Sequence, residues 1–207
     1  MLSRDTIAET AFRLTRDEPT TPLTLNRLGT ELGADPTALY RHYRNRDELL
    51  LAVVDQMYAD VIARLEPARD WRTSLRSVAH AMRGVLLERP ALVAEVGYRF
   101  TGGPHERRAI DITRAIFERA GLDPAQARLQ VRGFGEMMLS HAAMSAASLS
   151  LPDNVRRREL EIGCEVYGLD VGSMDEYESA TFESILETYL DGLAAQARAA
   201  RRVKAAS

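Results

Sequence analysis

The sequence predicts an all-α protein in which a small N-terminal domain of three helices is continuous with a larger helical domain. Three observations support this fold class. Apolar residues recur with helical spacing through most of the chain, and no segment shows the two-residue alternation of a β-strand. Cap residues followed by proline, or by glutamate three positions later, repeatedly mark helix starts. The 207 residues suffice for a small domain joined to a larger one.

The first helix is expected over residues 3–17, where apolar side chains such as Ile7 and Phe12 share one face after a Ser3 cap. Two prolines within residues 19–22 end it. A short second helix is expected to start at Thr24, whose hydroxyl can cap free amides, and to end at Gly33.

A third helix is expected from Pro36 to about Tyr43, because Asp35 supplies a cap and proline is favoured at the first helical position. Asn45 has capping-box spacing to Glu48 and opens a long fourth helix. That helix is expected to carry a continuous apolar face until Pro67 closes it.

Four more helices are expected over residues 71–88, 90–100, 105–120 and 124–148. Residues 150–173 are expected to be irregular, with room for one short helix around residues 155–162. Ser173 and Glu176 again have capping-box spacing, so a last helix is expected over residues 174–200. Two continuous domains are therefore expected, residues 1–47 and residues 48–207.

Composition and charge exclude several classes of protein. No apolar run approaches the length of a membrane-spanning helix, and the N-terminus lacks the pattern of a secretory signal, so a cytoplasmic protein with no membrane partner is expected. The single cysteine, Cys164, and four scattered histidines predict neither a metal site nor a cofactor. The net charge of −3 gives no sign of nucleic-acid binding, so that inference depends on where the charges lie.

Residues 24–46 have the pattern of a helix-turn-helix, with two short helices around a glycine-containing turn. Residues 36–46 carry three arginines and no acidic residue in a chain that is acidic overall. In this motif the first turns of the second helix face base edges in the major groove. The side chains expected to be exposed there are Pro36, Thr37, Ala38, Arg41 and His42, with Leu39 directed inward.

The stretch from Thr24 to Leu50, which ends LYRHYRNRDELL, resembles the DNA-binding domain of TetR-family transcriptional regulators. The resemblance implies base or phosphate contacts from Thr24, Asn26, Arg27, Pro36, Thr37, Ala38, Tyr40, His42 and Arg46. Arg41 and Tyr43 complete the expected DNA-binding set. Tyr40 and Tyr43 can equally be packing residues, and Thr24 only a cap. Residues 26, 43 and 46 depart from choices common in the family, so the operator sequence cannot be transferred.

The larger domain is expected to hold a pocket for a small, partly apolar effector between the fourth helix and the helices of residues 71–149. The candidate lining residues are Met57, Val61, Met82, Leu86, Tyr98, Phe117, Met138 and His141, with His141 as the polar anchor. Ordinary core packing is the alternative for each of them.

The resemblance also implies a homodimer, with an interface built from the last helix and the helix of residues 124–148 of each subunit. The candidate interface residues are Ala143, Ala147, Phe182, Leu186, Tyr189 and Leu193, and monomer core is the alternative. A dimer is favoured independently, because one short recognition helix rarely supplies adequate affinity and paired half-sites about 34–36 Å apart do.

The expected function is a repressor that a small molecule releases from a palindromic DNA operator. One alternative is a DNA-binding regulator without a small-molecule effector, and another is a helical-bundle enzyme. No Glu-x-x-His pair, glycine-rich phosphate loop or Ser-His-Asp spacing supports an enzyme, so no catalytic residue is expected.

Overall fold

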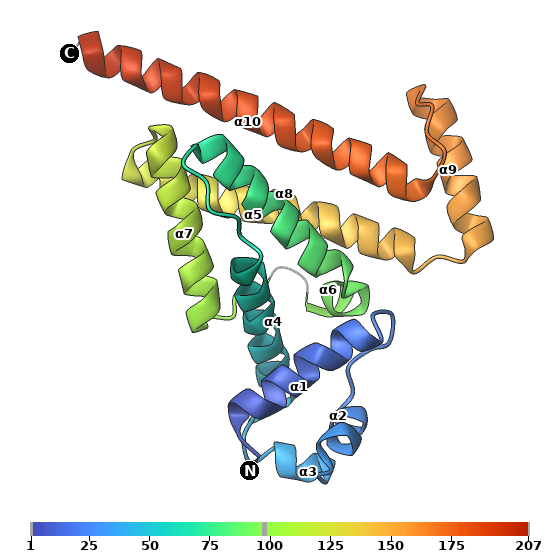
Figure 1. The fold of residues 1–207 in the computed structure, drawn as a ribbon. Coiled ribbons are helices and arrows are strands. Elements are labelled where there is room, and N and C mark those ends of the chain that lie inside the picture. The colour runs from blue at the N-terminus through green and yellow to red at the C-terminus, as the bar shows by residue number, and fades with distance from the viewer. Residues whose placement is uncertain (1, 97–98, 207) are drawn as a thin grey trace.

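A computed structural model describes the backbone of residues 2–96 and 99–206, which form ten helices and no strand. Helices α1 (Arg4–Asp17), α2 (Leu25–Leu32) and α3 (Pro36–Leu39) lie together at one end of the molecule. Helix α4 (Arg46–Ala63) runs from this end into a larger helical body (Figure 1). The predicted all-α fold class is confirmed.

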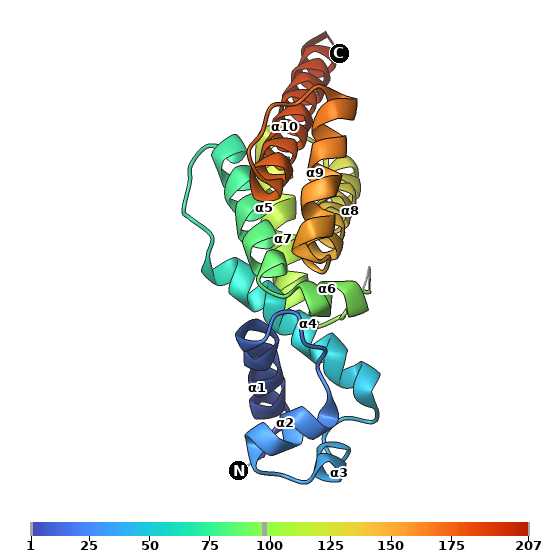
Figure 2. The same cartoon turned by 90° about the vertical axis from the view of Figure 1, so that its right-hand side faces the viewer.

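Six helices complete the body: α5 (Trp71–Leu87), α6 (Pro90–Val96), α7 (Pro104–Ala120), α8 (Pro124–Leu149), α9 (Asp153–Tyr167) and α10 (Met174–Ala206). Helix α10 lies at the end of the body farthest from α1–α3, and α6 lies close to the junction with α1 (Figure 2). Helices α1–α3 and the last helix are therefore separated by the body.

The N-terminal helices start where the caps predict. The side-chain oxygens of Ser3, Thr24 and Asp35 accept hydrogen bonds from the backbone N–H groups at positions 6, 27 and 37. Asn45 does the same for Glu48 N, at 2.8 Å, and so starts α4. These bonds satisfy amides that a helix start leaves without a partner.

Four expected helix extents are wrong. Helix α3 ends at Leu39, and residues 40–42 continue as a tight turn whose N–H groups bond to carbonyls three positions back. Helix α9 spans 15 residues in a segment expected to be mostly irregular. None of its residues is buried, and apolar side chains such as Ile162 and Val166 lie exposed on it. Helix α6 ends at Val96, earlier than expected, and α10 continues to Ala206.

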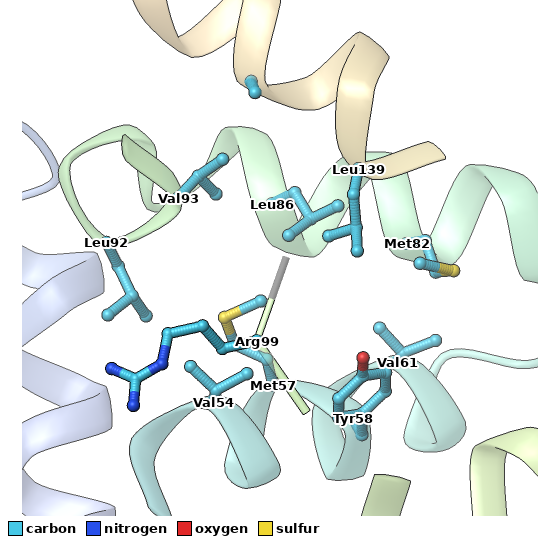
Figure 3. A pocket seen from close by; sticks show the side chains of 11 residues that line it. Val54, Met57, Tyr58, Val61, Met82, Leu86, Leu92, Val93, Arg99 and Leu139 are labelled. Atoms are coloured by element: carbon cyan, nitrogen blue, oxygen red, sulfur yellow. The ribbon is translucent and has the colours of Figure 1, made fainter. Parts of the chain in front are cut away.

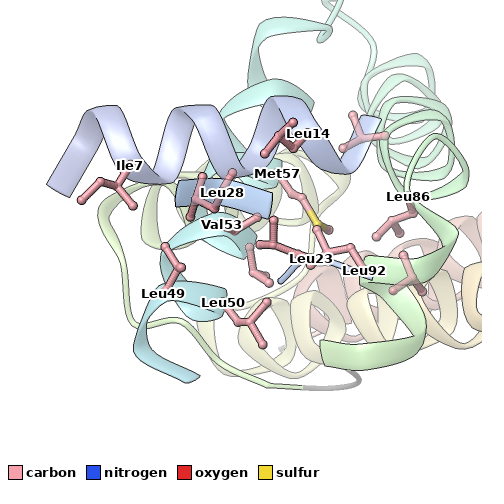
Figure 4. Close-up of a cluster of buried hydrophobic side chains, with 14 of the residues drawn as sticks. Ile7, Leu14, Leu23, Leu28, Leu49, Leu50, Val53, Met57, Leu86 and Leu92 are labelled. Atoms are coloured by element: carbon pink, nitrogen blue, oxygen red, sulfur yellow. The ribbon is translucent and has the colours of Figure 1, made fainter. Parts of the chain in front are cut away.

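Two hydrophobic cores hold the chain together. The first core joins α1–α4 to parts of α5, α6 and α8 (Figure 4), and it includes Ile7, Leu28, Leu39, Val53, Met57, Leu86, Leu92 and Ala142. The second core joins α5, α7, α8 and α10, and it includes Leu75, Ile116, Phe117, Phe134, Met138, Phe182, Leu186 and Leu193. Helix α4 thus shares one apolar core with the helix-turn-helix and with the body.

Candidate DNA-binding surface and ligand cavity

The turn between α2 and α3 depends on a glycine inside α2. A Cβ atom at Gly29 would lie 2.8 Å from the carbonyl oxygen of Ala34 and 3.1 Å from Cγ of Pro36. The Ala34 N–H donates to the Gly29 carbonyl at 2.9 Å, and Gly33 has φ of 60°, which favours glycine. Only a residue without a side chain lets the two helices approach this closely. The sequence interpretation did not single out Gly29, although a glycine inside a helical pattern indicates close packing.

The outward face of the helix-turn-helix largely matches the expectation. Thr24, Asn26, Thr37, Tyr40 and Arg41 are exposed, Pro36, Ala38 and His42 are partly exposed, and Leu39 is buried. The Thr37 hydroxyl donates to Oδ1 of Asp35 at 2.6 Å. That bond, together with one from the Thr37 N–H, lowers the pKa of the Asp35 carboxyl.

Tyr43 does not lie on this face. Its side chain is only 3% exposed, and its hydroxyl donates to the carbonyl oxygen of Arg4 at 2.8 Å. The Arg4 guanidinium lies over the Tyr43 ring, 4.4 Å from the centroid, and bonds Oε1 of Glu48 at 2.8 Å. Burial raises the pKa of the tyrosine hydroxyl. Tyr43 is therefore a packing residue that fastens α1 to the start of α4, and the expectation of a DNA-facing Tyr43 is corrected.

Two arginines expected to face DNA form hydrogen bonds and ion pairs with other residues of the protein. The Arg27 guanidinium donates to the Leu14 carbonyl at 3.0 Å and pairs with Glu18 at 3.2 Å. The Arg46 guanidinium donates to the Leu23 carbonyl at 2.8 Å and pairs with Glu95 of α6. Both guanidinium groups are thus already hydrogen-bonded and ion-paired within the chain, although the Arg46 side chain remains 41% exposed.

Arg41 and Arg44 present exposed positive charge next to α3. Both side chains are exposed, and neither has an ion-pair or side-chain hydrogen-bond partner among the described residues. The Arg44 backbone N–H donates to Oε2 of Glu48 at 2.7 Å, which fixes the backbone from which the side chain projects. Arg44 was part of the predicted basic run but not of the predicted contact set.

The body contains two adjoining cavities behind α4. The first has a volume of about 40 Å³ and is lined by Val54, Met57, Tyr58, Val61, Met82, Leu86, Leu92, Val93, Arg99, Leu139 and Ala143 (Figure 3). The second has a volume of about 330 Å³ and extends between α4, α5, α7 and α8. Both share Tyr58, Val61, Met82, Arg99 and Leu139, so they form one apolar space with two lobes. Its size and lining are typical of a small-molecule site.

The predicted pocket residues divide into two groups. Met57, Val61, Met82 and Leu86 line the cavity. Phe117 and Met138 are corrected to core residues, because both pack in the second core. His141 lies instead on a groove between α8, α9 and α10, and burial lowers its pKa. Tyr98 lies outside the described residues. Periodicity places a side chain on a helix face but does not show which faces enclose a void.

Buried carboxylates fix the wall between α4 and α7. The N-cap position of α7, Gly103, has no side chain, and Asp55 of α4 takes its place by accepting from Glu106 N at 2.9 Å. Asp55 also contacts Nδ1 of His105 at 2.9 Å. The Glu106 carboxylate in turn accepts from Gly102 N at 2.7 Å. Burial, with these carboxylates nearby, raises the pKa of Tyr58 to about 12, so its hydroxyl stays protonated in the cavity wall.

The apolar stripe expected to form the dimer interface is mostly monomer core. Phe182, Leu186 and Leu193 are at most 3% exposed and pack in the second core. The partly buried Tyr189 donates to Oε1 of Gln130 at 2.7 Å, and Ala143 lines the cavity. Of the predicted set only Ala147 is exposed. The stripe packs against α5, α7 and α8 of the same chain, which spacing alone could not distinguish from a partner.

Within the described residues, no helix is both long and apolar enough to cross a membrane. The same part of the chain holds no group of three or more side chains arranged to ligate a metal ion.

A helix-turn-helix with free arginines at one end, joined by α4 to a helical body with an apolar cavity, defines the class of helix-turn-helix transcriptional regulators. Residues 7–53 match the family model described as bacterial regulatory proteins, tetR family. The chain belongs to the TetR family of transcriptional regulators.

Two relatives of the chain are named as transcriptional regulators with a helix-turn-helix. It is 24% identical over 170 residues to an HTH-type transcriptional regulator of Saccharopolyspora erythraea, covering 78% of this chain and 72% of that protein. It is 30% identical over 154 residues to an HTH-type transcriptional repressor of Mycobacterium tuberculosis, covering 73% of this chain. The chain spans 50% of that repressor's length. The relatives are thus regulators of transcription rather than enzymes.

Solved structures share the fold over nearly the whole chain. A protein of Streptomyces coelicolor aligns with a TM-score of 0.77 at 24% identity, covering 95% of this chain and 99% of that one. ActR of Streptomyces coelicolor, in complex with (S)-DNPA, aligns with a TM-score of 0.73 at 24% identity and the same coverage. BioQ, bound to its double-stranded DNA operator, aligns with a TM-score of 0.65 at 23% identity, covering 94% and 99%. These similarities concern the fold.

Proposed function

We propose that the chain acts as a homodimeric repressor that binds a palindromic DNA operator and is released by a small molecule bound in the cavity. Residues 1–47 would bind DNA, and residues 48–207 would bind the effector and the second subunit. The observation that carries the proposal is the pair of free arginines, Arg41 and Arg44, on a helix-turn-helix that shares its core with the cavity wall.

The DNA contacts follow from exposure. Thr37 and His42 lie at the start of α3 and in the turn after it, where this motif meets base edges. Arg41, Arg44 and the half-exposed Tyr40 surround them and are suited to phosphate oxygens. BioQ, whose fold this chain shares, was solved on its operator duplex, which supports the same use of the motif here.

The effector site follows from the cavity. Its mostly apolar lining suits a small, largely apolar molecule, and ActR was solved with a small molecule bound. Met57 and Val54 pack in the first core together with Leu28 of α2. A ligand that displaces them would therefore change packing that the DNA-binding helices share. Coupling between the two sites requires such a ligand to bind one arrangement of these helices more tightly than the other.

The second subunit is assigned to an apolar face of α8, α9 and α10. Met144, Val166 and Tyr167 are 75%, 68% and 70% exposed, and they border one groove together with Ile162 and Ile185. Large apolar side chains gathered and exposed around one groove are typical of a protein–protein contact surface. A two-fold pairing through it would supply the second recognition helix that a palindromic operator demands.

The DNA contact is tested with an operator selected from a random duplex pool and binding measured across a range of salt concentrations. Arg41→Ala and Arg44→Ala should each weaken binding to every duplex and lower the salt slope by about 0.9, because each phosphate contact releases condensed counterions. Arg69→Ala is the matched control, since Arg69 is an exposed arginine in the loop between α4 and α5. The assignment fails if all three variants keep the wild-type salt slope.

A further inference from the structure

We propose that the effector is an amphipathic acid, with an apolar body inside the cavity and an anionic group that takes the Arg99 guanidinium away from Asp47. This inference rests on the proposed function and adds to it the chemical class of the effector and the contact through which it acts.

The charged residues around the larger lobe of the cavity favour an anion. Four arginines line it, at positions 99, 114, 128 and 132, against two carboxylates, Glu106 and Glu136. Glu106 already accepts backbone N–H groups, and Glu136 is paired with Arg132 at 2.6 Å. Arg114 is likewise paired with Asp111 at 2.9 Å. The positive charge left for a ligand is therefore that of Arg128, which has no acidic partner among the described residues, and that of Arg99, whose partner is exposed. An acidic group on a ligand is the natural complement of these two.

Arg99 is the arginine that both lobes share. Its aliphatic part runs along the cavity below Leu92, and its guanidinium lies at the end away from Tyr58 (Figure 3). The guanidinium bonds both carboxylate oxygens of Asp47, the second at 2.5 Å. Rotation about side-chain bonds could turn this group from Asp47 toward the lobe without moving the backbone.

The Arg99–Asp47 ion pair is weak enough for a ligand acid to replace Asp47 as the partner of Arg99. The two side chains are 42% and 54% exposed, so water and salt screen the attraction between them. A ligand whose apolar body fills the cavity would bring its carboxylate to the same guanidinium at a place where less water competes for hydrogen bonds. A charged hydrogen bond is stronger there. The ligand acid can therefore displace the protein acid.

The exchange would reach the DNA-binding end directly. Asp47 is in the first turn of α4, next to Arg46, which pairs with Glu95. These two ion pairs connect the start of α4 to α6 and to the segment that follows it. Loss of the Asp47 pair removes one of the contacts that hold the first turn of α4, which directly follows the turn of residues 40–45 (the recognition turn). The acid and the operator would therefore favour different positions of this first turn.

The test compares acids with their neutral amides. Decanoic acid and decanamide, and 2-naphthoic acid and 2-naphthamide, are titrated into the full-length protein by calorimetry. At least one acid should bind at least about tenfold more tightly than its amide, the effect of a charged hydrogen bond. Arg99→Gln should remove that preference by weakening the acid and leaving the amide unchanged.

A second variant tests the competition itself. Asp47→Asn should tighten acid binding severalfold, because the guanidinium no longer has a protein partner. Asp175→Asn is the matched control: it also removes a first-turn carboxylate paired with an arginine, Arg156, but on α10. It should leave acid binding unchanged.

Three results would overturn the inference: equal binding of acids and amides, an acid preference that persists in Arg99→Gln, or no binding of either acid at millimolar concentration. Operator binding by the wild type is measured in parallel. A neutral compound that releases the operator would overturn the acidic effector and leave the proposed function standing, whereas no binding to any duplex would overturn the function itself.

Discussion

The first hydrophobic core joins the DNA-binding helices to the cavity, whereas the second core holds only helices of the body. Leu28 of α2 and Leu39 of α3 belong to the first core together with the cavity-lining Met57 and Leu86. The second core, around Phe182, contains no residue of α1–α4. Packing therefore does not divide the chain at the domain boundary expected between residues 47 and 48, because α4 packs against the helix-turn-helix and against the body.

This difference separates two kinds of substitution. A change in the second core should alter stability without altering DNA binding by the folded protein. A change in the first core should alter both stability and DNA binding, since the helix-turn-helix and the cavity wall pack against the same side chains.

The largest expected effect is that of Phe182→Ala. The ring is 1% exposed, and the Arg83 guanidinium lies 5.0 Å from its centroid. Its removal should lower the free energy of unfolding by about 3–5 kcal/mol, measured by urea denaturation at fixed protein concentration. Operator affinity, measured where the variant is folded, should equal that of the wild type. A loss of affinity beyond the unfolded fraction would break the separation of the two cores.

Gly29→Ala should have a smaller effect on stability and a clear effect on DNA binding. The added Cβ would lie 2.8 Å from the Ala34 carbonyl oxygen. The backbone must move to relieve this contact, which should lower the free energy of unfolding by about 1–3 kcal/mol. Because α3 must shift, operator affinity should fall as well.

Gly192→Ala is the matched control for this prediction. Gly192 lies inside α10 with no atom within 4 Å of an added Cβ. Alanine there should leave operator affinity unchanged and raise stability by up to about 1 kcal/mol. Equal loss of DNA binding in both variants would contradict the role assigned to Gly29.

The smallest expected effect concerns the pH dependence of the junction between α3 and α4. The Arg44 N–H and, after it, Arg4 lower the pKa of Glu48 below its ordinary 4.5. A lowered pKa in the folded state means that the stabilisation is complete above pH 4.5 and is lost as the pH falls through the folded-state value. Glu48→Gln should therefore shift the urea midpoint at neutral pH, and the difference from wild type should shrink on acidification.

Glu187 provides the comparison from the body, since Arg72 and Arg76 lower its pKa in the same way. Glu187→Gln should give a similar pH profile for unfolding. Only Glu48→Gln should also speed hydrogen exchange of the Arg44 amide, because that amide loses an ionised acceptor. Equal exchange of this amide in the two variants would contradict a local role for Glu48.

The helix starts and the helix-turn-helix were predictable because their signals are local. The Asn45 side chain reaches an amide three residues away, and Asp35 reaches one two residues away. A basic run without acids between residues 36 and 46 is likewise visible in the sequence, and it marks the region that carries Arg41 and Arg44. The resemblance to TetR-family regulators rests on the same short stretch.

The sequence by itself determined the helical fold class, the position of the recognition turn and the family, because caps, spacing and local charge do not depend on distant residues. Only the tertiary structure decided which arginines are free and which apolar faces enclose a cavity. The acceptors that hold Arg27 and Arg46 come from Leu14, Leu23 and Glu95, and the partner of Arg99 lies 52 positions away. Such contacts arise when helices pack, so no local pattern encodes them.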